Sequence, residues 1–306
     1  MSVRRLQKIK GGSYIISLPS DWVRKMGLDV KSGLKVYEVF DGLKIRPPNE
    51  AKNEKVIPLV DVEDVKYLVL TYYMQGIDRI VVRSPRVIPL EVKKELRELQ
   101  LQAYGLEVES ETFDSITFKV NVNVNADLES SFRAFTGKIL SIMEDVQVML
   151  ERFSEEMRDD LLARLSILNK DYRLVIRQIA LGVQKDDELT FMVYPKDVVL
   201  FAIAIRDLGR FLSHLSLFLK VIGAQEAKEM TQHFTVLKKL LHDSVQMFLT
   251  EDLSAMREIR SNFKKLERES PGTEAGKEVV KMGSYCVAMM DNAVNKSVRI
   301  FDFKVR

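Results

Sequence analysis

The stretch that decides the N-terminal fold covers residues 11–47 and reads GGSYIISLPSDWVRKMGLDVKSGLKVYEVFDGLKIRP. Its β-favouring runs are interrupted by glycine at short intervals, which predicts short strands rather than long helices. The doublet Gly11-Gly12 is typical of a turn. We therefore expect one strand over Val3–Ile9 and a second over Tyr14–Leu18.

A short helix and a β-hairpin follow within the same stretch. Pro19 suits the start of a helix and Gly27 its end, because proline has the helical φ and glycine tolerates the left-handed conformation beyond the last turn. Asp41-Gly42 is the strongest short-range hairpin signal. The predicted elements are a helix over Ser20–Met26 and hairpin strands over Leu34–Phe40 and Leu43–Arg46.

The middle of the chain alternates strand and helix. Pro47-Pro48 and a polar stretch to Lys55 predict a linker, and the alternation predicts a small α/β domain with a parallel pair of strands. We place its strands at Val56–Val60, Arg79–Arg83, Leu106–Glu111 and Ile116–Val122, and its helices at Val62–Met74 and Leu90–Tyr104. The predicted domains cover residues 1–48, 52–124 and 125–306.

The third predicted domain has a helical period throughout. Two sets of apolar residues alternate steps of three and four, as in the seam of a left-handed bundle. They are Leu161, Leu165, Leu168, Tyr172, Val175 and Ile179, and Ala204, Leu208, Phe211, Leu215, Phe218 and Ile222. We place six helices near residues 127–151, 155–184, 195–222, 226–250, 252–269 and 276–303. Phe135-Thr136 recurs as Phe234-Thr235, so we expect two three-helix bundles side by side.

Length and composition describe a folded multidomain chain of the α+β class. Its 306 residues are 46% hydrophobic and 30% charged, with a formal net charge of +3. The excess positive charge lies in residues 1–50, which hold ten Lys/Arg and five Asp/Glu. The single cysteine, Cys286, excludes an internal disulfide and favours a reducing, cytoplasmic setting. The sequence shows no signal peptide or membrane-spanning stretch, so we expect a soluble protein without membrane insertion.

Basic residues are concentrated at the first strand. In an extended strand alternate side chains share a face, so Arg4, Lys8 and Lys10 project together. Such cations bind phosphate groups, glycine permits close approach of the backbone, and the Ser13 hydroxyl adds a hydrogen bond. The alternative is that these cations and Arg5 are solvated charges on an edge strand, where lysine prevents strand-to-strand aggregation.

Residues 3–47 resemble the AbrB/MazE/SpoVT family of swapped-hairpin DNA-binding domains. The shared features are Gly11-Gly12-Ser13, alternating apolar residues up to Leu18-Pro19, a short helix that ends at Gly27-Leu28, and the Asp41-Gly42 hairpin. The resemblance implies a dimeric β-barrel, because one half-barrel of about fifty residues cannot bury its own core. It implies that double-stranded DNA is contacted by Arg4, Arg5, Lys8, Lys10, Ser13, Arg24 and Lys25.

This chain departs from the MazE pattern at three positions. Gly12 stands where asparagine is usual, and Ile15 and Ser17 stand where relatives carry arginine, so base readout is not carried over. Trp22 is the only tryptophan and lies among apolar residues of the short helix. We expect it to fill the dimer seam rather than to stack on bases.

Residues 126–306 resemble the PhoU family, whose members are built from two three-helix bundles and act in phosphate uptake control. The resemblance rests on helix number and length, the internal duplication and a local similarity at Ile205–Arg210. A swapped-hairpin domain joined to a PhoU-like bundle is an arrangement found in archaeal regulators. PhoU proteins carry acidic residues four apart that gather metal ions, but here Arg206 and Arg210 stand at such places and would repel a cation.

We expect no metal, no cofactor and no catalysis. Glu155/Asp159 and Glu156/Asp160 fit a solvated helix start, and Asp207 and Asp291 are the residual metal candidates. The spacing of His214, His233 and His242 predicts no zinc site, and each is expected to be a surface or hydrogen-bonded residue. Phosphate-cradling and nucleophile motifs are missing, and Cys286 follows an apolar period that predicts a buried, inert thiol.

Arg206 and Arg210 share a helix face with His214 one turn further on. These three residues form either an anion pocket or salt bridges with Asp207 and neighbouring carboxylates, and the second reading is the simpler one.

The leading hypothesis is a homodimeric transcription regulator of phosphate uptake or homeostasis that binds DNA electrostatically. The first alternative is a protein-interaction regulator, in which the helical domain binds a phosphate transporter or a signalling partner and the barrel only dimerises. The second is an antitoxin-like protein. It is disfavoured because about 260 residues of folded chain follow the barrel in place of a short disordered tail.

Overall fold

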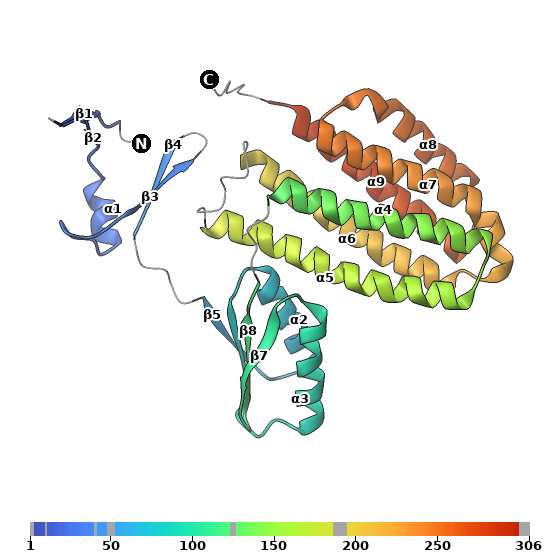
Figure 1. Cartoon of the computed structure of the whole chain (residues 1–306), viewed down its shortest axis with the longest axis horizontal. Coiled ribbons are helices and arrows are strands. Elements are labelled where there is room, and N and C mark those ends of the chain that lie inside the picture. Colours follow the sequence, from blue (N-terminus) through green and yellow to red (C-terminus); the bar gives the residue numbers. More distant parts are fainter. Residues whose placement is uncertain are drawn as a thin grey trace. The chain divides into compact units, whose positions relative to one another are not determined.

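The computed structural model describes residues 3–9, 11–39, 42–47, 53–122, 127–185 and 195–299. The chain divides into two compact units, Met1–Lys52 and Asn53–Arg306 (Figure 1).

The first unit begins with a short hairpin. β1 (Gln7–Lys8) pairs antiparallel with β2 (Tyr14–Ile15), with Lys8 opposite Tyr14. Gly11 and Gly12 have φ of 121° and 98°, a conformation that side chains with a Cβ rarely adopt, so the tight turn needs both glycines. The hairpin is confirmed, but both strands are shorter than predicted because their outer residues have no strand partner within the described part of one copy.

The predicted short helix is confirmed as α1 (Ser20–Lys25). Gly27 follows it with φ of 64°, and the Gly27 amide donates to the Arg24 carbonyl oxygen while the Leu28 amide donates to that of Val23. These two hydrogen bonds form a Schellman motif, which satisfies the last carbonyl groups of the helix. The glycine therefore ends the helix for the reason that the sequence indicated.

A second hairpin completes the first unit. β3 (Lys35–Val39) pairs antiparallel with β4 (Gly42–Arg46), and Val39 lies opposite Gly42. The predicted hairpin is confirmed, although Gly42 belongs to the strand rather than to the turn. Asp41 lies outside the described residues.

The two hairpins remain separate sheets within one copy. β1 pairs with β2 and β3 with β4, and in the described part of a single chain no closed barrel forms. Every described residue of this unit is exposed or half-buried. The expected barrel is thus not reached by one copy, because two small hairpins and a two-turn helix cannot enclose a core.

The second unit opens with an α/β layer whose elements follow the predicted order. They are β5 (Glu54–Pro58), α2 (Val62–Met74), β6 (Arg79–Arg83), α3 (Leu90–Arg97), the 3₁₀ helix η1 (Glu98–Gln102), β7 (Leu106–Glu111) and β8 (Ser115–Val120). The sheet order is β5-β6-β8-β7, and α2 and α3 lie on one face of it (Figure 1). The predicted parallel pair is confirmed as β5 and β6, and the other two pairings are antiparallel.

Several boundaries in this layer differ from the predictions. β5 ends at Pro58 rather than Val60, and β8 covers Ser115–Val120 rather than Ile116–Val122. Two further differences have a clear physical cause. The first strand begins at Glu54 rather than Val56, because Glu54 and Lys55 pair with Arg79 and Ile80 of β6. The second helix loses its α-helical geometry after Arg97 and continues as η1, which brings Leu99 into the core beneath the sheet. Long-range pairing and packing determine both boundaries.

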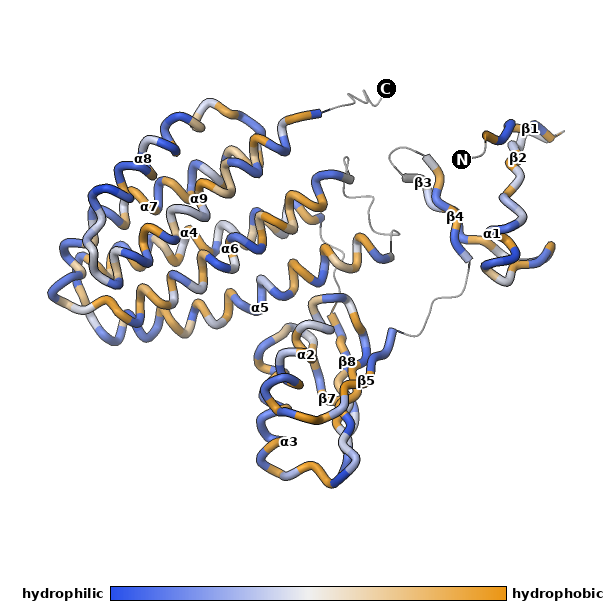
Figure 2. Tube along the Cα trace, turned by 180° about the vertical axis from the view of Figure 1, so that it is seen from behind, coloured by the Kyte–Doolittle hydropathy of each residue, from blue (hydrophilic) through white to orange (hydrophobic). Residues whose placement is uncertain are grey.

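Six α-helices occupy the described residues of the second unit after the α/β layer. They are α4 (Leu128–Glu151), α5 (Glu155–Lys185), α6 (Pro195–Val221), α7 (Ala224–Thr250), α8 (Met256–Glu269) and α9 (Glu274–Ser297), with the 3₁₀ turn η3 (Leu253–Ala255) before α8. Apolar and polar residues alternate along each helix at helical spacing (Figure 2). The two predicted seams are confirmed, because all their residues are buried except Tyr172, which is half-buried.

The two triplets of helices are not separate bundles. α6 packs along α9 and α4 packs along α7, so all six helices contribute to one continuous core. At its centre the rings of Phe132, Phe201 and Phe248, from α4, α6 and α7, lie within 5.3 Å of one another. The expectation of two bundles side by side is therefore corrected, since aromatic side chains interlock across the boundary between the triplets.

The last helix ends earlier than predicted. α9 stops at Ser297, and Val298 is extended. The Lys196 ammonium group donates to the carbonyl oxygens of Asn295 and Val298, which satisfies groups that a longer helix would have bonded internally. Among the described helices, none combines the length and the apolar character that crossing a membrane requires.

The α/β layer is fastened to the helical bundle through α5. Arg177 is 2% exposed and donates to the carbonyl oxygens of Tyr73 and Ile77 and to the Asp78 carboxylate. Gly76, at the end of α2, has a left-handed φ of 85°, and a Cβ there would lie 2.7 Å from the Leu181 side chain. The contact is thus close and hydrogen-bonded, so the second unit is one packed body.

Candidate nucleic-acid interface

The predicted DNA-contacting residues lie on the surface of the first unit. Arg4, Arg5, Lys8 and Ser13 are exposed, as are Arg24 and Lys25 on α1. Lys10 lies outside the described residues. β1 includes only Lys8 of the predicted cationic face, so a common face for Arg4, Lys8 and Lys10 stays a prediction.

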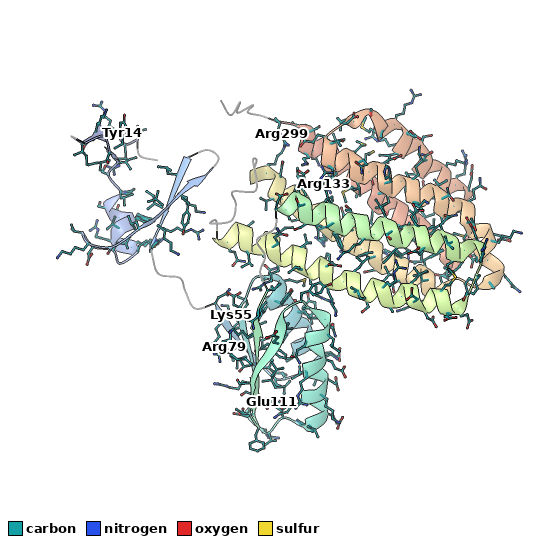
Figure 3. All side chains as sticks on the ribbon, viewed as in Figure 1. Tyr14, Lys55, Arg79, Glu111, Arg133 and Arg299 are labelled. Carbon is teal, nitrogen blue, oxygen red and sulfur yellow. The ribbon has the colours of Figure 1, made fainter. Side chains whose placement is uncertain are left out.

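The first hairpin holds Lys8 in a defined position. Tyr14 lies on this hairpin (Figure 3). Lys8 is opposite Tyr14 in the strand register, and its Nζ is 5.8 Å from the centroid of the Tyr14 ring. The Ser13 carbonyl oxygen accepts from the Ile9 amide, and the Ile9 carbonyl oxygen accepts from the Gly12 amide. An exposed cation–π contact stabilises by only about 0.5–1 kcal/mol, so the ammonium group is oriented but free to bind a phosphate.

The two cations of α1 differ in their surroundings. The Arg24 guanidinium lies 2.6 Å from the Asp21 carboxylate one turn earlier, and both side chains are exposed. Lys25 follows at the end of the helix. A surface pair of this kind contributes little, about 0–1 kcal/mol, so it competes only weakly with a phosphate group.

The second hairpin has two chemically different faces. Directly opposite residues of an antiparallel pair share a face, so Val36, Leu43 and Ile45 lie on one side. The other side carries Tyr37 and the three cations Lys35, Lys44 and Arg46. The sequence reasoning did not single out these cations, although the alternation in Lys35-Val36-Tyr37 and Lys44-Ile45-Arg46 was a signal for them.

The apolar residues of the first unit are left open to solvent. Val36 is 58% exposed and Leu43 is 68% exposed, and the first hairpin repeats the pattern with Leu6, Tyr14 and Ile15. Trp22 is half-buried. Exposed apolar side chains on this scale, in a piece without a core, are typical of a surface that another chain covers.

The loop between α1 and β3 is stabilised by Asp29. Its carboxylate accepts from the Lys31 amide and the Ser32 hydroxyl, and these hydrogen bonds lower the pKa of Asp29. The loop therefore places β3 by local chemistry, without a contribution from a core.

The acidic pairs considered as metal ligands lie beside cations. Asp159 pairs with Arg158, Asp160 lies 3.8 Å from Arg164, and Asp291 lies 3.9 Å from Arg260. Across the described ranges, no three His, Cys, Asp or Glu side chains gather in a way that could hold a metal ion.

The histidines and the cysteine of the helical bundle have structural surroundings. His214 Nδ1 lies 2.5 Å from a carboxylate oxygen of Glu278, and His233 and His242 also have polar partners, as predicted. His214 does not line the cavity to which Arg206 and Arg210 belong. Cys286 is buried, and burial raises the pKa of its thiol.

The comparison with known families supports one part of the chain. A family model described as "Antidote-toxin recognition MazE, bacterial antitoxin" matches residues 7–53. Neither a curated protein nor a solved structure matches the chain. The match confirms the MazE/AbrB-like character of the N-terminal residues, and a domain of this type suggests a DNA-binding or antitoxin-like role. The PhoU-like resemblance of the helical part gains no support from it.

Proposed function

We propose that the protein is a DNA-binding transcription regulator without catalytic activity, and that it dimerises through residues 1–48. The observation that carries the proposal is the exposed cationic segment of the first unit. Arg4, Arg5 and Lys8 are exposed beside a glycine turn, and a MazE-type family model matches the chain from residue 7.

Dimerisation accounts for the open apolar surface of the first unit. Burial of one valine or leucine side chain stabilises by about 1.5–3 kcal/mol, and this unit offers several of them in each copy. Two copies related by a two-fold axis would bury these side chains and bring two cationic strands to one surface. A symmetric protein then favours a palindromic or repeated DNA site.

Phosphate contacts predict a strong salt dependence. With Arg4 and Lys8 of both copies bound to DNA, four phosphates are neutralised, and affinity should fall about a hundredfold between 50 and 200 mM salt. Fluorescence anisotropy with a labelled duplex measures this slope. Equal affinity at both salt concentrations would contradict the proposal.

Substitutions distinguish a specific DNA-contacting lysine from the overall positive charge of the protein. Lys8→Ala removes one phosphate contact per copy, so the slope of log affinity against log salt should decrease by about two, on all duplex sequences. Lys220→Ala is the matched control, because Lys220 is an exposed lysine of α6 in the second unit. An unchanged slope in Lys8→Ala would remove this residue from the interface.

We further propose that the regulated process is phosphate uptake or homeostasis, on the PhoU-like resemblance of the helical part. A gel shift with upstream DNA of phosphate-transport operons, compared with unrelated DNA of equal length, tests this point. Binding of neither duplex would instead favour a regulator that acts on a phosphate-transport or signalling protein and uses its N-terminal residues only to dimerise.

A further inference from the structure

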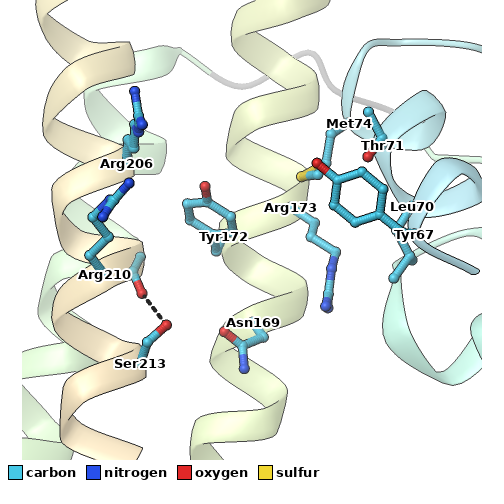
Figure 4. Close-up of a pocket in the computed structure, with 11 residues that line it drawn as sticks. Tyr67, Leu70, Thr71, Met74, Asn169, Tyr172, Arg173, Arg206, Arg210 and Ser213 are labelled. Carbon is cyan, nitrogen blue, oxygen red and sulfur yellow. Dashed lines mark hydrogen bonds between the residues drawn. The ribbon is translucent and has the colours of Figure 1, made fainter. Parts of the chain in front are cut away.

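A cavity of about 450 Å³ lies where the α/β layer meets the helical bundle of the second unit (Figure 4). α2 contributes Tyr67, Leu70, Thr71 and Met74, α5 contributes Asn169, Tyr172 and Arg173, and α6 contributes Arg206, Gly209, Arg210 and Ser213. The volume is within the range of small-molecule sites. The contact of α2 with α5, held by Arg177, keeps its walls in place.

The lining has a strongly positive charge. It includes three arginines and no aspartate or glutamate. Within the described part of the chain, the guanidinium groups of Arg206 and Arg210 form no hydrogen bond or ion pair. Arg173 donates to the Gln102 carbonyl oxygen but has no carboxylate partner there. The expected salt bridges of Arg206 and Arg210 are thus not formed.

The three arginines repel one another weakly, and a bound anion would relieve this repulsion. Arg206 and Arg210 are one helical turn apart, and like charges at this spacing destabilise a helix. Arg173 is half-buried, and desolvation lowers the pKa of its guanidinium group. Asp207, the acid beside them in sequence, does not line the cavity, and burial raises its pKa in spite of the two neighbouring guanidinium groups. The cavity therefore lacks a counter-charge of its own.

Hydrogen-bonding groups accompany the arginines. The Thr71 Oγ1 is buried and has no hydrogen-bond partner among the described residues. The Tyr172 ring packs against Gly209, where a Cβ would lie 2.7 Å from the ring, so the missing side chain makes room for the tyrosine.

The two walls of the cavity have different polarity. Leu70 and Met74 of α2 are apolar, and the Tyr67 ring lies beside them, whereas α6 presents Arg206 and Arg210 (Figure 4). Three guanidinium groups match an anion with more than one charge, and phosphate oxygens accept the paired hydrogen bonds that arginine donates. The apolar wall suits an uncharged part of the same molecule.

We propose that this cavity binds a small molecule that carries phosphate groups, with Arg173, Arg206 and Arg210 holding the phosphates and the α2 wall holding the remainder. The inference is independent of DNA binding, since the cavity lies wholly within the second unit. It places a ligand in a cavity lined by α2 of the α/β layer and by α5 and α6 of the bundle, where binding would link these three helices.

Calorimetric titration of the full chain tests the proposal with defined probes. ADP and pyrophosphate should bind saturably, and adenosine should bind at least about tenfold more weakly than ADP, since it lacks the charged groups. Tighter binding of ADP than of pyrophosphate would support a contact between the α2 wall and the uncharged part of the ligand. Equal binding would mean that the arginines alone provide the affinity. Citrate that binds as tightly as both phosphate probes would overturn phosphate as the recognised group.

Substitutions locate the site. Arg206 and Arg210 are exposed, so Arg206→Gln and Arg210→Gln leave the fold intact, and each should weaken ADP and pyrophosphate binding about tenfold or more. Arg257→Gln is the matched control, because Arg257 is exposed on α8 away from the lining. Unchanged affinity in Arg206→Gln and Arg210→Gln, or no saturable binding of either probe, would overturn the proposal. If these variants still bind DNA with the same salt dependence, the loss of ligand binding in the cavity is independent of DNA binding by the first unit.

Discussion

The two units of the chain differ in whether one copy can bury its own apolar side chains. In the first unit no residue whose exposure is described is fully buried, and Val36, Leu43 and Ile15 are exposed. In the second unit two clusters of buried residues fill the α/β layer and the helical bundle. The first unit is therefore expected to depend on a partner copy and the second to be stable alone, because stability follows the apolar area that is removed from water.

The largest expected effect is the loss of dimerisation when the apolar face of the first unit is disrupted. Val36→Asp places a carboxylate on the apolar face of the second hairpin in both copies. Burial of these two charges should weaken the dimer by at least about 4 kcal/mol, or about a thousandfold, as measured by sedimentation equilibrium of the full chain. Val60→Asp is the control, because Val60 is an exposed valine of the second unit. A fully dimeric Val36→Asp variant would locate the dimer contact elsewhere.

A core substitution in the second unit should affect stability without affecting association. Phe248 is fully buried, and its ring lies 5.1 Å from that of Phe132. Phe248→Ala leaves a cavity and should lower the free energy of unfolding by about 3–5 kcal/mol, as measured by urea denaturation. Leu217→Ala, at an exposed position of α6, should cost less than about 1 kcal/mol. An equally small loss for Phe248→Ala would mean that the six helices do not share one packed core.

The contact between the α/β layer and α5 can be tested separately. Arg177→Met leaves two carbonyl oxygens and the Asp78 carboxylate without their donor, so the free energy of unfolding should fall by about 2–3 kcal/mol. Hydrogen exchange should rise first in α2. Arg164→Met on the same helix removes only surface ion pairs and should change stability by less than about 1 kcal/mol. Unchanged exchange in α2 after Arg177→Met would refute the fastening role.

The smallest effect is a dependence on alkaline pH that belongs to the second unit. Burial raises the pKa of Tyr73 to about 12, and its hydroxyl group donates to the Tyr104 carbonyl oxygen. The unfolded chain loses this proton near pH 10 while the folded chain keeps it, so stability is complete below pH 10 and is lost as pH rises towards 12. Between pH 9 and 11 the loss from this residue is about 1.3 kcal/mol.

Two phenylalanine variants isolate that contribution. In Tyr73→Phe the loss of unfolding free energy between pH 9 and 11 should be smaller than in the natural chain by this amount. Tyr67→Phe lies on the same helix at an exposed position and should leave the loss unchanged. If both variants behave alike, the buried hydroxyl group is not responsible.

Much of the fold follows from local signals. Gly27 ends α1, the Asp41-Gly42 signal predicts the hairpin of β3 and β4, and the two helical seams lie in the core where their spacing places them. These predictions succeed because capping, turn formation and amphipathic periodicity depend on residues within a few positions of one another. The lengths of β1 and β2 were overestimated, since strand length depends on a partner strand.

The residues of the candidate sites also fall into those that the sequence predicts and those that only the tertiary structure brings together. The sequence by itself determined the cationic first strand, the MazE-like hairpins and the burial of Cys286, because charge and periodicity are visible along the chain. Only the tertiary structure decided that Arg177 would fasten α5 to α2 and that Arg173 would join Arg206 and Arg210 around one cavity. Those residues come together from different helices, and no local pattern records which side chains two packed helices will enclose between them.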